Sequence, residues 1–395
     1  MPWMNKSREN NKVDRTTFRK RIIVHKAKIL GVVFIVLMAL FITLIVMYNS
    51  YASKVYTDYD VMGSVESVVA KGARVLNYQD EFITYSADGI HCTDSKGRDV
   101  WSFPYQMQSP MVDVRGDYVA VADYNGRYAY VFNLSGELGT IQTSTPIKSI
   151  KVSGTGIVCL VTDEDTVTPI TLYYYDGSQI ASFRTTMAKS GYPLAIGISE
   201  DSKLVGVSYL YVDNGTVMSK VAFYNFGEVG QNETDNLVSG YDYMGEVVPV
   251  VEFLDNRTAF ALANDKLLFY EGKERPTNSA NILLNEQVQA VFYGDGLVGL
   301  LYLNSQGDTK YRLEVYGSNA EKLTDICFDL EYQDIFFAND RVVIYNASSA
   351  LIYTKSGMIK YQGEFKKPVS LMIPSSSSTK YVIVTDEDIE TIVLK

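Results

Sequence analysis

The stretch "VADYNGRYAYVFNLSGELG" (residues 121–139) reads as three short strands separated by an Asn125-Gly126 turn and a Ser135-Gly136 turn. Asn-Gly between apolar runs is a strong hairpin signal, because both residues accept the positive φ of a tight turn. Glycine turns flanked by apolar or aromatic strands recur at intervals of 39 to 50 residues, at Gly97, Gly136, Gly177, Gly227, Gly272, Gly317 and Gly357. A period of about 40–50 residues is typical of propeller blades.

Each repeat also contains a second, upstream hairpin whose first strand is almost continuously apolar. Examples are "IVCLV" (157–161) and "LVGLLYL" (297–303). Such a run is expected where a strand is covered on both faces, as when sheets stack around an axis. Gly206 and Gly299 lie inside these runs and suit the crowded inner part of a ring.

The turns divide the chain into seven full strand sets and one incomplete set. The full sets are about 71–109, 110–145, 146–191, 192–244, 245–286, 287–332 and 333–367, and the eighth begins near Val369 without an outer strand. The segment "VMGSVESVVA" (61–70) could supply that strand and close the ring, which hides strand edges that would otherwise aggregate. The predicted fold is therefore all-β, an eight-bladed β-propeller. A seven-bladed ring is the alternative if sets are mispartitioned around residues 227–246.

An apolar segment near the N-terminus, Ile29 to Met47, holds 19 residues without a charge. As a helix it covers roughly 28 Å, close to the ~30 Å hydrocarbon thickness of a bilayer. The first 28 residues carry nine Lys or Arg against two acidic residues, so they hold +7 and the rest of the chain −17. The positive-inside rule then predicts a cytoplasmic N-terminus and an extracellular C-terminal domain.

These patterns divide the chain into a basic, disordered cytoplasmic tail (1–28), a transmembrane helix (29–48), a linker (49–60) and an extracytoplasmic β-propeller (61–395). A cleavable signal peptide is the alternative, since Ser50-Tyr51-Ala52 has the pattern of a cleavage site. The apolar run exceeds the ~7–15 residues of a signal-peptide core, which favours an uncleaved anchor in the cell membrane. N-terminal sequencing of membrane-extracted protein distinguishes the two.

The most distinctive polar pattern is "VTDED", which occurs at 161–165 and again at 384–388. Both copies end the second strand of a blade, so both turns are expected on one face of the ring. Carboxylates gathered there could attract a cationic partner or hold Ca²⁺, although Asp is also common in turns that bind nothing. The candidate binding-face residues are Asp88, Asp123, Asp163, Glu164, Asp165, Asp213, Asp265, Asp386, Glu387 and Asp388. Among them, Asp163, Asp165, Asp386 and Asp388 are the candidate calcium ligands, and calorimetric titration with Ca²⁺ tests this hypothesis.

Residues suited to catalysis are scarce. His25 lies in the basic tail and His91 lies in a strand, so we expect no histidine-based triad or metal cluster outside the membrane and a structural role for His91. Cys92, Cys159 and Cys327 are few and far apart, which predicts buried apolar thiols rather than disulfides or a zinc motif. No catalytic or cofactor-binding residue is identified, which favours a protein that is not an enzyme.

The segment "IHCTDSKGRDVWSF" (90–103) resembles the blade repeat of quinoprotein-like and WD40-like propellers, with a Gly turn before a Trp-bearing outer strand. The layout of basic tail, single anchor and Tyr-rich propeller resembles an uncharacterised family of single-pass membrane proteins of Firmicutes, catalogued as a domain of unknown function. The resemblance implies a Gram-positive envelope protein and brings no catalytic residues. Quinone-dependent dehydrogenases of this fold need docking Trp residues in most blades, and this chain has only Trp3 and Trp101.

The leading functional hypothesis is a non-enzymatic scaffold that binds a protein, peptide or cell-wall partner outside the membrane. The alternative is an envelope hydrolase or small-ligand sensor with its site in the propeller channel. Carboxylates that converge at the channel mouth would favour this alternative, whereas an exposed apolar or aromatic patch would favour the scaffold. The basic tail is expected to touch anionic lipid rather than nucleic acid, because no folded basic motif accompanies it.

Overall fold

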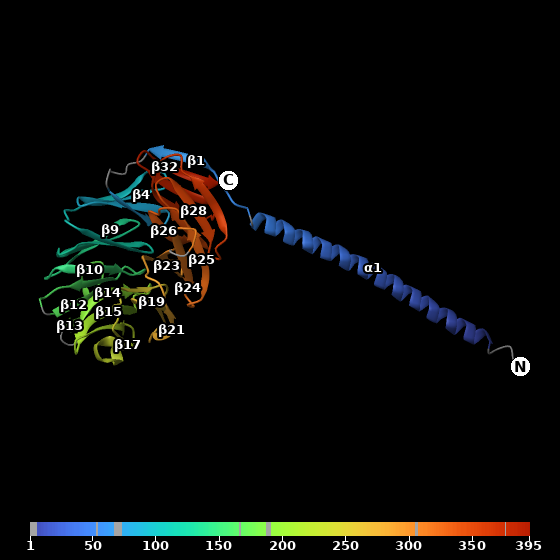
Figure 1. Cartoon of the computed structure of the whole chain (residues 1–395), viewed down its shortest axis with the longest axis horizontal. Coiled ribbons are helices and arrows are strands. Elements are labelled where there is room, and N and C mark those ends of the chain that lie inside the picture. Colours follow the sequence, from blue (N-terminus) through green and yellow to red (C-terminus); the bar gives the residue numbers. More distant parts are fainter. Residues whose placement is uncertain are drawn as a thin grey trace. The chain divides into compact units, whose positions relative to one another are not determined.

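The computed structural model describes residues 6–52, 54–66, 73–165, 167–186, 191–304, 307–375 and 377–395. The chain forms two compact units, residues Met1–Val55 and Tyr56–Lys395. The first unit contains one helix, α1 (Lys6–Ala52), and the second unit is built from strands (Figure 1).

Helix α1 extends well beyond the predicted membrane segment. It contains a stretch, Arg19–Leu44, that is long and apolar enough to cross a membrane, a property that signal sequences share. The prediction of a disordered tail is wrong for residues 6–28, which are helical. This part of the chain has no Gly or Pro, so nothing interrupts the helix on the N-terminal side of the apolar segment. Residues 1–5 of the predicted tail lie outside the described residues.

Eight four-stranded antiparallel sheets make up the second unit, which confirms the eight-bladed propeller. We number the blades in chain order, each with its innermost strand first. Blades 1 to 4 are β2 (Arg74–Tyr78), β3 (Glu81–Tyr85), β4 (Gly89–Asp94) and β5 (Asp99–Pro104); β6 (Pro110–Arg115), β7 (Tyr118–Asp123), β8 (Tyr128–Asn133) and β9 (Gly136–Gln142); β10 (Ile147–Val152), β11 (Val158–Thr162), β12 (Val167–Tyr173) and β13 (Gln179–Thr186); and β14 (Tyr192–Ile198), β15 (Leu204–Asp213), β16 (Thr216–Asn225) and β17 (Leu237–Met244).

Blades 5 to 7 repeat this order, and blade 8 takes its outer strand from the other end of the chain. Their strands are β18 (Val250–Phe253), β19 (Thr258–Leu262), β20 (Lys266–Glu271) and β21 (Thr277–Leu283); β22 (Ala290–Gly294), β23 (Leu297–Leu303), β24 (Tyr311–Gly317) and β25 (Lys322–Phe328); β26 (Asp334–Ala338), β27 (Arg341–Tyr345), β28 (Ser349–Thr354) and β29 (Ile359–Glu364); and β30 (Val369–Pro374), β31 (Lys380–Thr385), β32 (Asp388–Leu394) and β1 (Tyr59–Glu66).

The long segment 227–246 does not add a blade. It forms two short 3₁₀ turns, η1 (Gly230–Asn232) and η2 (Thr234–Asn236), and then enters β17, the outer strand of blade 4. The predicted strand sets therefore match the blades one for one, and the seven-bladed alternative is wrong.

The ring closes where the two ends of the propeller chain pair in blade 8. Strand β1 lies antiparallel beside β32, with Tyr59 opposite Leu394 (Figure 1). The prediction of a closing strand at 61–70 is confirmed for its first six residues, and residues 67–70 lie outside the described part of the chain. Just before β1, the amide of Tyr56 donates to the Lys360 carbonyl over 2.8 Å. The incoming linker thus also pairs with the free edge of β29 in blade 7.

The core lies in the seams between neighbouring blades. The second strands of the blades are the most deeply covered, and every residue of β11 and β19 is buried. Tyrosines fill many seams, as expected, and the fully buried ones include Tyr59, Tyr78, Tyr209, Tyr270, Tyr345 and Tyr361. A Cβ atom on Gly206 would lie 2.9 Å from the Val251 side chain of the next blade, which confirms the crowding expected at that glycine.

Gly299 provides a direct test of this packing. A Cβ there would lie 2.7 Å from the Phe337 ring and 3.1 Å from the Leu313 side chain. We expect Gly299→Val to lower the free energy of unfolding by about 1–3 kcal/mol, because overpacking forces side chains away from their rotamers. Chemical denaturation measures the change. Gly63→Ala is the matched control, since a Cβ at that position would have no atom within 4 Å, and it should have little effect. Equal midpoints for both variants would contradict the packing.

Candidate functional site

The two faces of the ring carry different turns. In each blade the turn between the second and third strands lies on one face, which we call the hairpin face, because the strands are antiparallel. The turns between the first and second strands and between the third and fourth lie on the other, which we call the Gly-turn face. All ten predicted acidic residues lie at turns of the hairpin face, as their shared position in the repeat predicted.

Several of these acidic side chains are engaged within their own part of the ring. Asp123 accepts hydrogen bonds from the Gln108 and Ser109 amides at 3.0 and 2.7 Å, so it orders the connection from blade 1 to blade 2. Lys148 pairs with Asp163 at 3.4 Å. The other engaged members are Glu164 with Arg184, Asp213 with Asn214, Asp265 with Lys266, Asp386 with Ser370, and Glu387 and Asp388 with Lys367.

The structure does not gather these acids into one site. The two "VTDED" turns belong to blades 3 and 8, which are not neighbours in the ring. Within the described ranges, no group of three or more His, Cys, Asp or Glu is arranged to hold a metal ion. Calcium binding at Asp163, Asp165, Asp386 and Asp388 stays a prediction, and the positions of these residues suit a diffuse acidic rim better than a metal site.

A different polar cluster lies at the ring axis, on the innermost strands. Lys151 on β10 pairs with Glu252 on β18 and lies 3.5 Å from Asp113 on β6. The Tyr293 hydroxyl on β22 donates to Glu252 over 3.0 Å, and Asp113 accepts from the Val152 amide over 2.7 Å. The four side chains come from blades 2, 3, 5 and 6, so the cluster joins the neighbouring blades 2 and 3 to the neighbouring blades 5 and 6 across blade 4.

Burial decides the electrostatics of this cluster. Burial raises the pKa of Glu252, and the attraction of Lys151 opposes that rise. Burial by itself lowers the pKa of Lys151, but Glu252 and Asp113 together outweigh it and raise that pKa above its ordinary value. Lys151 therefore remains charged at neutral pH. A second cross-ring link lies nearby, where Arg115 donates to Glu200 over 2.9 Å and to the Phe253 carbonyl over 2.7 Å.

The sequence-based reasoning missed this axial cluster, which we define as Asp113, Lys151, Glu252 and Tyr293. Its one signal is a single charge inside an otherwise apolar inner strand, as in "VVEF" (250–253). Carboxylates do converge at the axis, which was the criterion for a channel enzyme or sensor. They are, however, bonded to Lys151, to Tyr293 and to the Val152 amide, so the cluster links blades and does not form an open acid–base pair.

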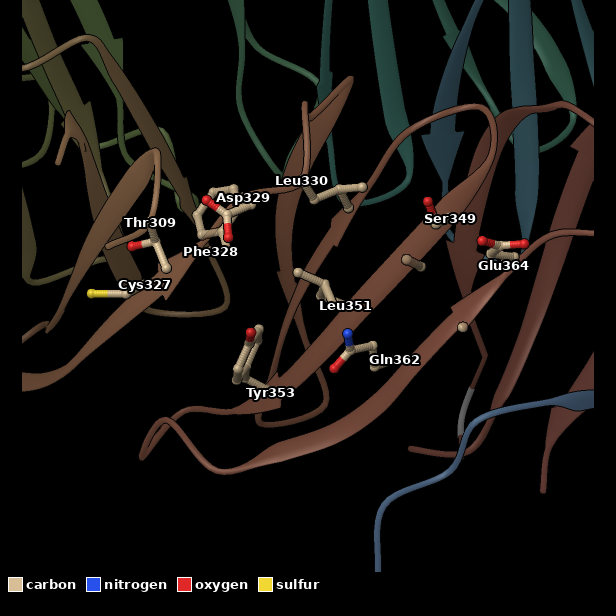
Figure 2. A pocket seen from close by; sticks show the side chains of 12 residues that line it. Thr309, Cys327, Phe328, Asp329, Leu330, Ser349, Leu351, Tyr353, Gln362 and Glu364 are labelled. Carbon is tan, nitrogen blue, oxygen red and sulfur yellow. The ribbon is translucent and has the colours of Figure 1, made fainter. Parts of the chain in front are cut away.

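Two pockets open between the outer parts of neighbouring blades. One, of about 650 Å³, lies between blades 6 and 7 and is lined by Thr309, Cys327 and Asp329 from blade 6 and by Leu351 and Tyr353 from blade 7, with the Cys327 sulfur pointing away from Leu351 (Figure 2). The Cys327 thiol is exposed there, which corrects the expectation that all three cysteines are buried; only Cys92 and Cys159 are. Cys327 lies in β25, the outermost strand of blade 6, which has no neighbouring strand at its outer edge.

The second pocket, of about 510 Å³, lies between blades 3 and 4 and has aromatic walls. The Phe183 and Tyr224 rings stack with centroids 4.2 Å apart, and the Tyr209 and Tyr224 hydroxyls are 2.8 Å apart. Tyr211 also lines the pocket and donates to Asp242 over 3.3 Å. This pocket adjoins the central hairpin of blade 4.

That hairpin is the most prominent feature of the hairpin face. Strands β15 and β16 have ten residues each, whereas β11 and β19 in the adjacent blades have five. Five extra residues correspond to roughly 17 Å of strand. Near its tip Val212 is 69% exposed and Val217 is 40% exposed, and Met244 beside them on β17 is 73% exposed. The turn itself has positive φ at Asn214 and Gly215, as the Asn-Gly signal predicted.

Other exposed apolar residues share this face in the same sector. We define the apolar ridge as Leu194, Val212, Val217, Met244, Leu283 and Leu303, all at hairpin-face ends of strands in blades 4, 5 and 6. The hairpin face also exposes Tyr124 and Tyr128 in blade 2, and on the Gly-turn face exposed apolar side chains are spread over blades 1, 2, 3, 4, 6 and 7. A concentration of exposed apolar side chains on one sector of one face marks an interaction site.

The fold and its surface define the class: an eight-bladed β-propeller with one apolar N-terminal helix. The chain belongs to the family of unknown function DUF5711, whose family model matches residues 52–394. No curated protein matches the sequence. Among solved structures, Sqt1 from Chaetomium thermophilum, bound to the N-terminus of ribosomal protein L10, is 10% identical, with a TM-score of 0.51 over 86% of this chain and 100% of that one. BamB from Moraxella catarrhalis is 10% identical, with a TM-score of 0.47 over 85% of this chain and 100% of that chain. These likenesses describe the fold alone.

Proposed function

We propose that this protein is a membrane-anchored, non-enzymatic docking platform that binds a protein partner outside the cell membrane through the apolar ridge. The observation that carries the proposal is the overhanging hairpin of blade 4 with its exposed Val212, Val217 and Met244. Exposed apolar side chains at a projecting tip lower the solubility of the free protein. A bound partner would remove this apolar surface from water, which favours binding. Sqt1, which shares the fold, was solved bound to the N-terminus of ribosomal protein L10.

A channel enzyme or small-ligand sensor is less well supported. The charged groups at the axis are bonded to one another, and no cluster among the described residues offers an unpaired carboxylate pair there. The sequence layout further suggests that the protein belongs to a Gram-positive cell envelope. The same surface could bind a peptide or a cell-wall ligand in place of a folded protein.

Site-specific photocrosslinking in the native membrane tests the docking surface. A photoreactive residue at Val212 should give one discrete adduct, whereas the same residue at Tyr174, which is 49% exposed on the Gly-turn face, should not. Val217→Asp should weaken the adduct about tenfold, because a charge at the centre of an apolar contact costs on the order of 1–2 kcal/mol. Identical adducts from both positions, or an undiminished adduct in Val217→Asp, would contradict the assignment.

The orientation is part of the proposal. Strand β1 begins beside Leu394, on the Gly-turn face, so the linker joins the ring there. We therefore expect the Gly-turn face to point toward the membrane and the hairpin face away from it. In a Cys327→Ser background, which removes the exposed thiol, Asp163→Cys and Glu387→Cys should react with an impermeant maleimide on intact cells, whereas Ser356→Cys should be shielded. The reverse labelling pattern would refute this orientation.

A further inference from the structure

The pocket between the outer parts of blades 3 and 4 has the features of a ligand site. Its volume of about 510 Å³ falls within the ~300–1,000 Å³ usual for small-molecule sites, whose walls are mostly apolar or aromatic with a few polar groups. We propose that this pocket binds a small carboxylate with an aromatic or apolar body, and that Lys220 holds the carboxylate group. The proposal rests neither on the membrane anchor nor on the apolar ridge.

Aromatic side chains from both blades form the walls that would hold the body of the ligand. Phe183 of blade 3 and Tyr224 of blade 4, which stack on each other, are 8% and 7% exposed. Tyr209 and Tyr211 on β15 add two further rings to the lining. Tyr209 lies opposite Lys220 in the register of β15 and β16, so the ring and the lysine side chain share one side of the sheet.

Lys220 is a half-buried cation of the pocket lining that forms no ion pair with any residue that the structure describes. Its side chain lies across Gly240 on β17, where a Cβ atom would be 3.1 Å from the Lys220 Cε and 3.8 Å from its Nζ. A partly buried charge is costly unless it is paired. An anionic ligand would supply the missing partner. Other half-buried lysines of the ring each pair with a carboxylate, among them Lys148, Lys151, Lys266 and Lys367.

A second hydrogen-bond donor is available in the same pocket. The Tyr209 and Tyr224 hydroxyls share one hydrogen bond, which uses only one of their two protons. Burial raises the pKa of both hydroxyls, so both stay protonated at neutral pH. Neither has another hydrogen-bond partner among the described residues, and the remaining proton can be donated to a ligand oxygen. A carboxylate accepts hydrogen bonds from a hydroxyl and an ammonium group together.

Acidic groups around the pocket limit the charge of the ligand. Asp235 also lines the pocket, and the second cation of the lining, Arg184, lies 3.8 Å from Glu164. Asp242 lies opposite Lys220 in the register of β16 and β17 without forming an ion pair with it. These carboxylates disfavour a dianion such as a phosphate monoester, because only Lys220 is left to neutralise the ligand. A monoanionic carboxylate fits this balance.

Ligand-detected NMR titration of the full-length protein in detergent tests the proposal, with phenylacetate as the probe and phenylacetamide as its uncharged counterpart. We expect saturable binding of phenylacetate and about tenfold weaker binding of phenylacetamide. Lys220→Met should weaken phenylacetate binding by a similar factor and leave phenylacetamide binding unchanged, whereas a misfolded variant would lose both. The matched control is Lys96→Met, which removes an exposed lysine of blade 1 and should bind phenylacetate as the unaltered protein does.

The substitution Asp235→Asn provides a test of the opposite sign. Asp235 has a φ of 56°, a conformation that Asn also adopts, so the backbone should be retained. Loss of this negative charge should strengthen phenylacetate binding about twofold, a gain that a folding defect cannot produce. Phenylacetamide binding should not change.

Several results would overturn the proposal. These are the absence of saturable phenylacetate binding, equal binding of phenylacetate and phenylacetamide, equal losses in Lys220→Met and Lys96→Met, unchanged or weaker phenylacetate binding in Asp235→Asn, or tighter binding of phenyl phosphate than of phenylacetate. The docking proposal is tested separately by the adduct at Val212, in an assay to which no small ligand is added, so either proposal can fail without the other.

Discussion

The substitution Lys151→Met is expected to lower the free energy of unfolding by about 3–5 kcal/mol, because it leaves the buried Glu252 carboxylate without its cation. Glu252 is only 7% exposed, and Lys151 is its one ion-pair partner among the described residues. Urea denaturation followed by intrinsic fluorescence measures the change. The loss should exceed that of any surface ion pair, such as Arg98 with Asp94, whose removal should cost at most about 1 kcal/mol.

The pH dependence of this variant distinguishes lost charge compensation from lost packing. Burial raises the pKa of Glu252 above its unfolded value, and removal of Lys151 raises it further. A raised folded pKa means that stability is intact while the carboxyl is protonated and declines as pH rises through the folded pKa. Lys151→Met should therefore approach the wild type in acid and fall behind toward neutral pH. A deficit that is constant with pH would indicate lost packing instead. The double variant Lys151→Met/Glu252→Leu should recover most of the loss.

Removal of the closing strand is expected to prevent formation of a soluble monomer. A chain that begins at Ser67 lacks β1 and leaves the edge of β32 unpaired. It also removes Tyr59, which is fully buried, and an aromatic side chain of about 150–250 Å² at about 25 cal/mol per Å² contributes roughly 4–6 kcal/mol. Size-exclusion chromatography should show aggregation for this chain and a monomer for the chain that begins at Lys54.

A peptide of residues 54–68 provides the control for this truncation. It supplies Tyr56, which pairs with β29, and all of β1, so it should restore monomeric protein when present during refolding. A monomer from the shortened chain without the peptide would show that the ring is stable with seven complete blades and an open eighth, and closure would then contribute little.

Two expectations are wrong, one about the secondary structure of residues 6–28 and one about the burial of Cys327. Residues 6–28 lack apolar periodicity, which indicated disorder, but helix α1 continues through them because no residue breaks it. Cys327 was expected to be buried, yet it lies at the outer strand of blade 6 beside a pocket. Whether a side chain is buried depends on its strand's place in the blade and on the residues that cover that strand. The spacing of three cysteines in the sequence gives neither.

The number of blades, their boundaries and the closing strand were readable from the sequence alone. Each depends on short-range chemistry: glycine and Asn-Gly turns, apolar runs of strand length, and a last set that lacked one strand. The side chains that meet across the ring were not readable. Lys151 and Glu252 are 101 residues apart and lie in blades that share no seam, and only the curvature that closes eight sheets into a ring brings their inner strands together at the axis. The exposure of the blade 4 hairpin also depends on tertiary structure. Strand β15 has ten residues and the corresponding strands of the adjacent blades, β11 and β19, have five, so the neighbouring blades do not cover the end of the hairpin.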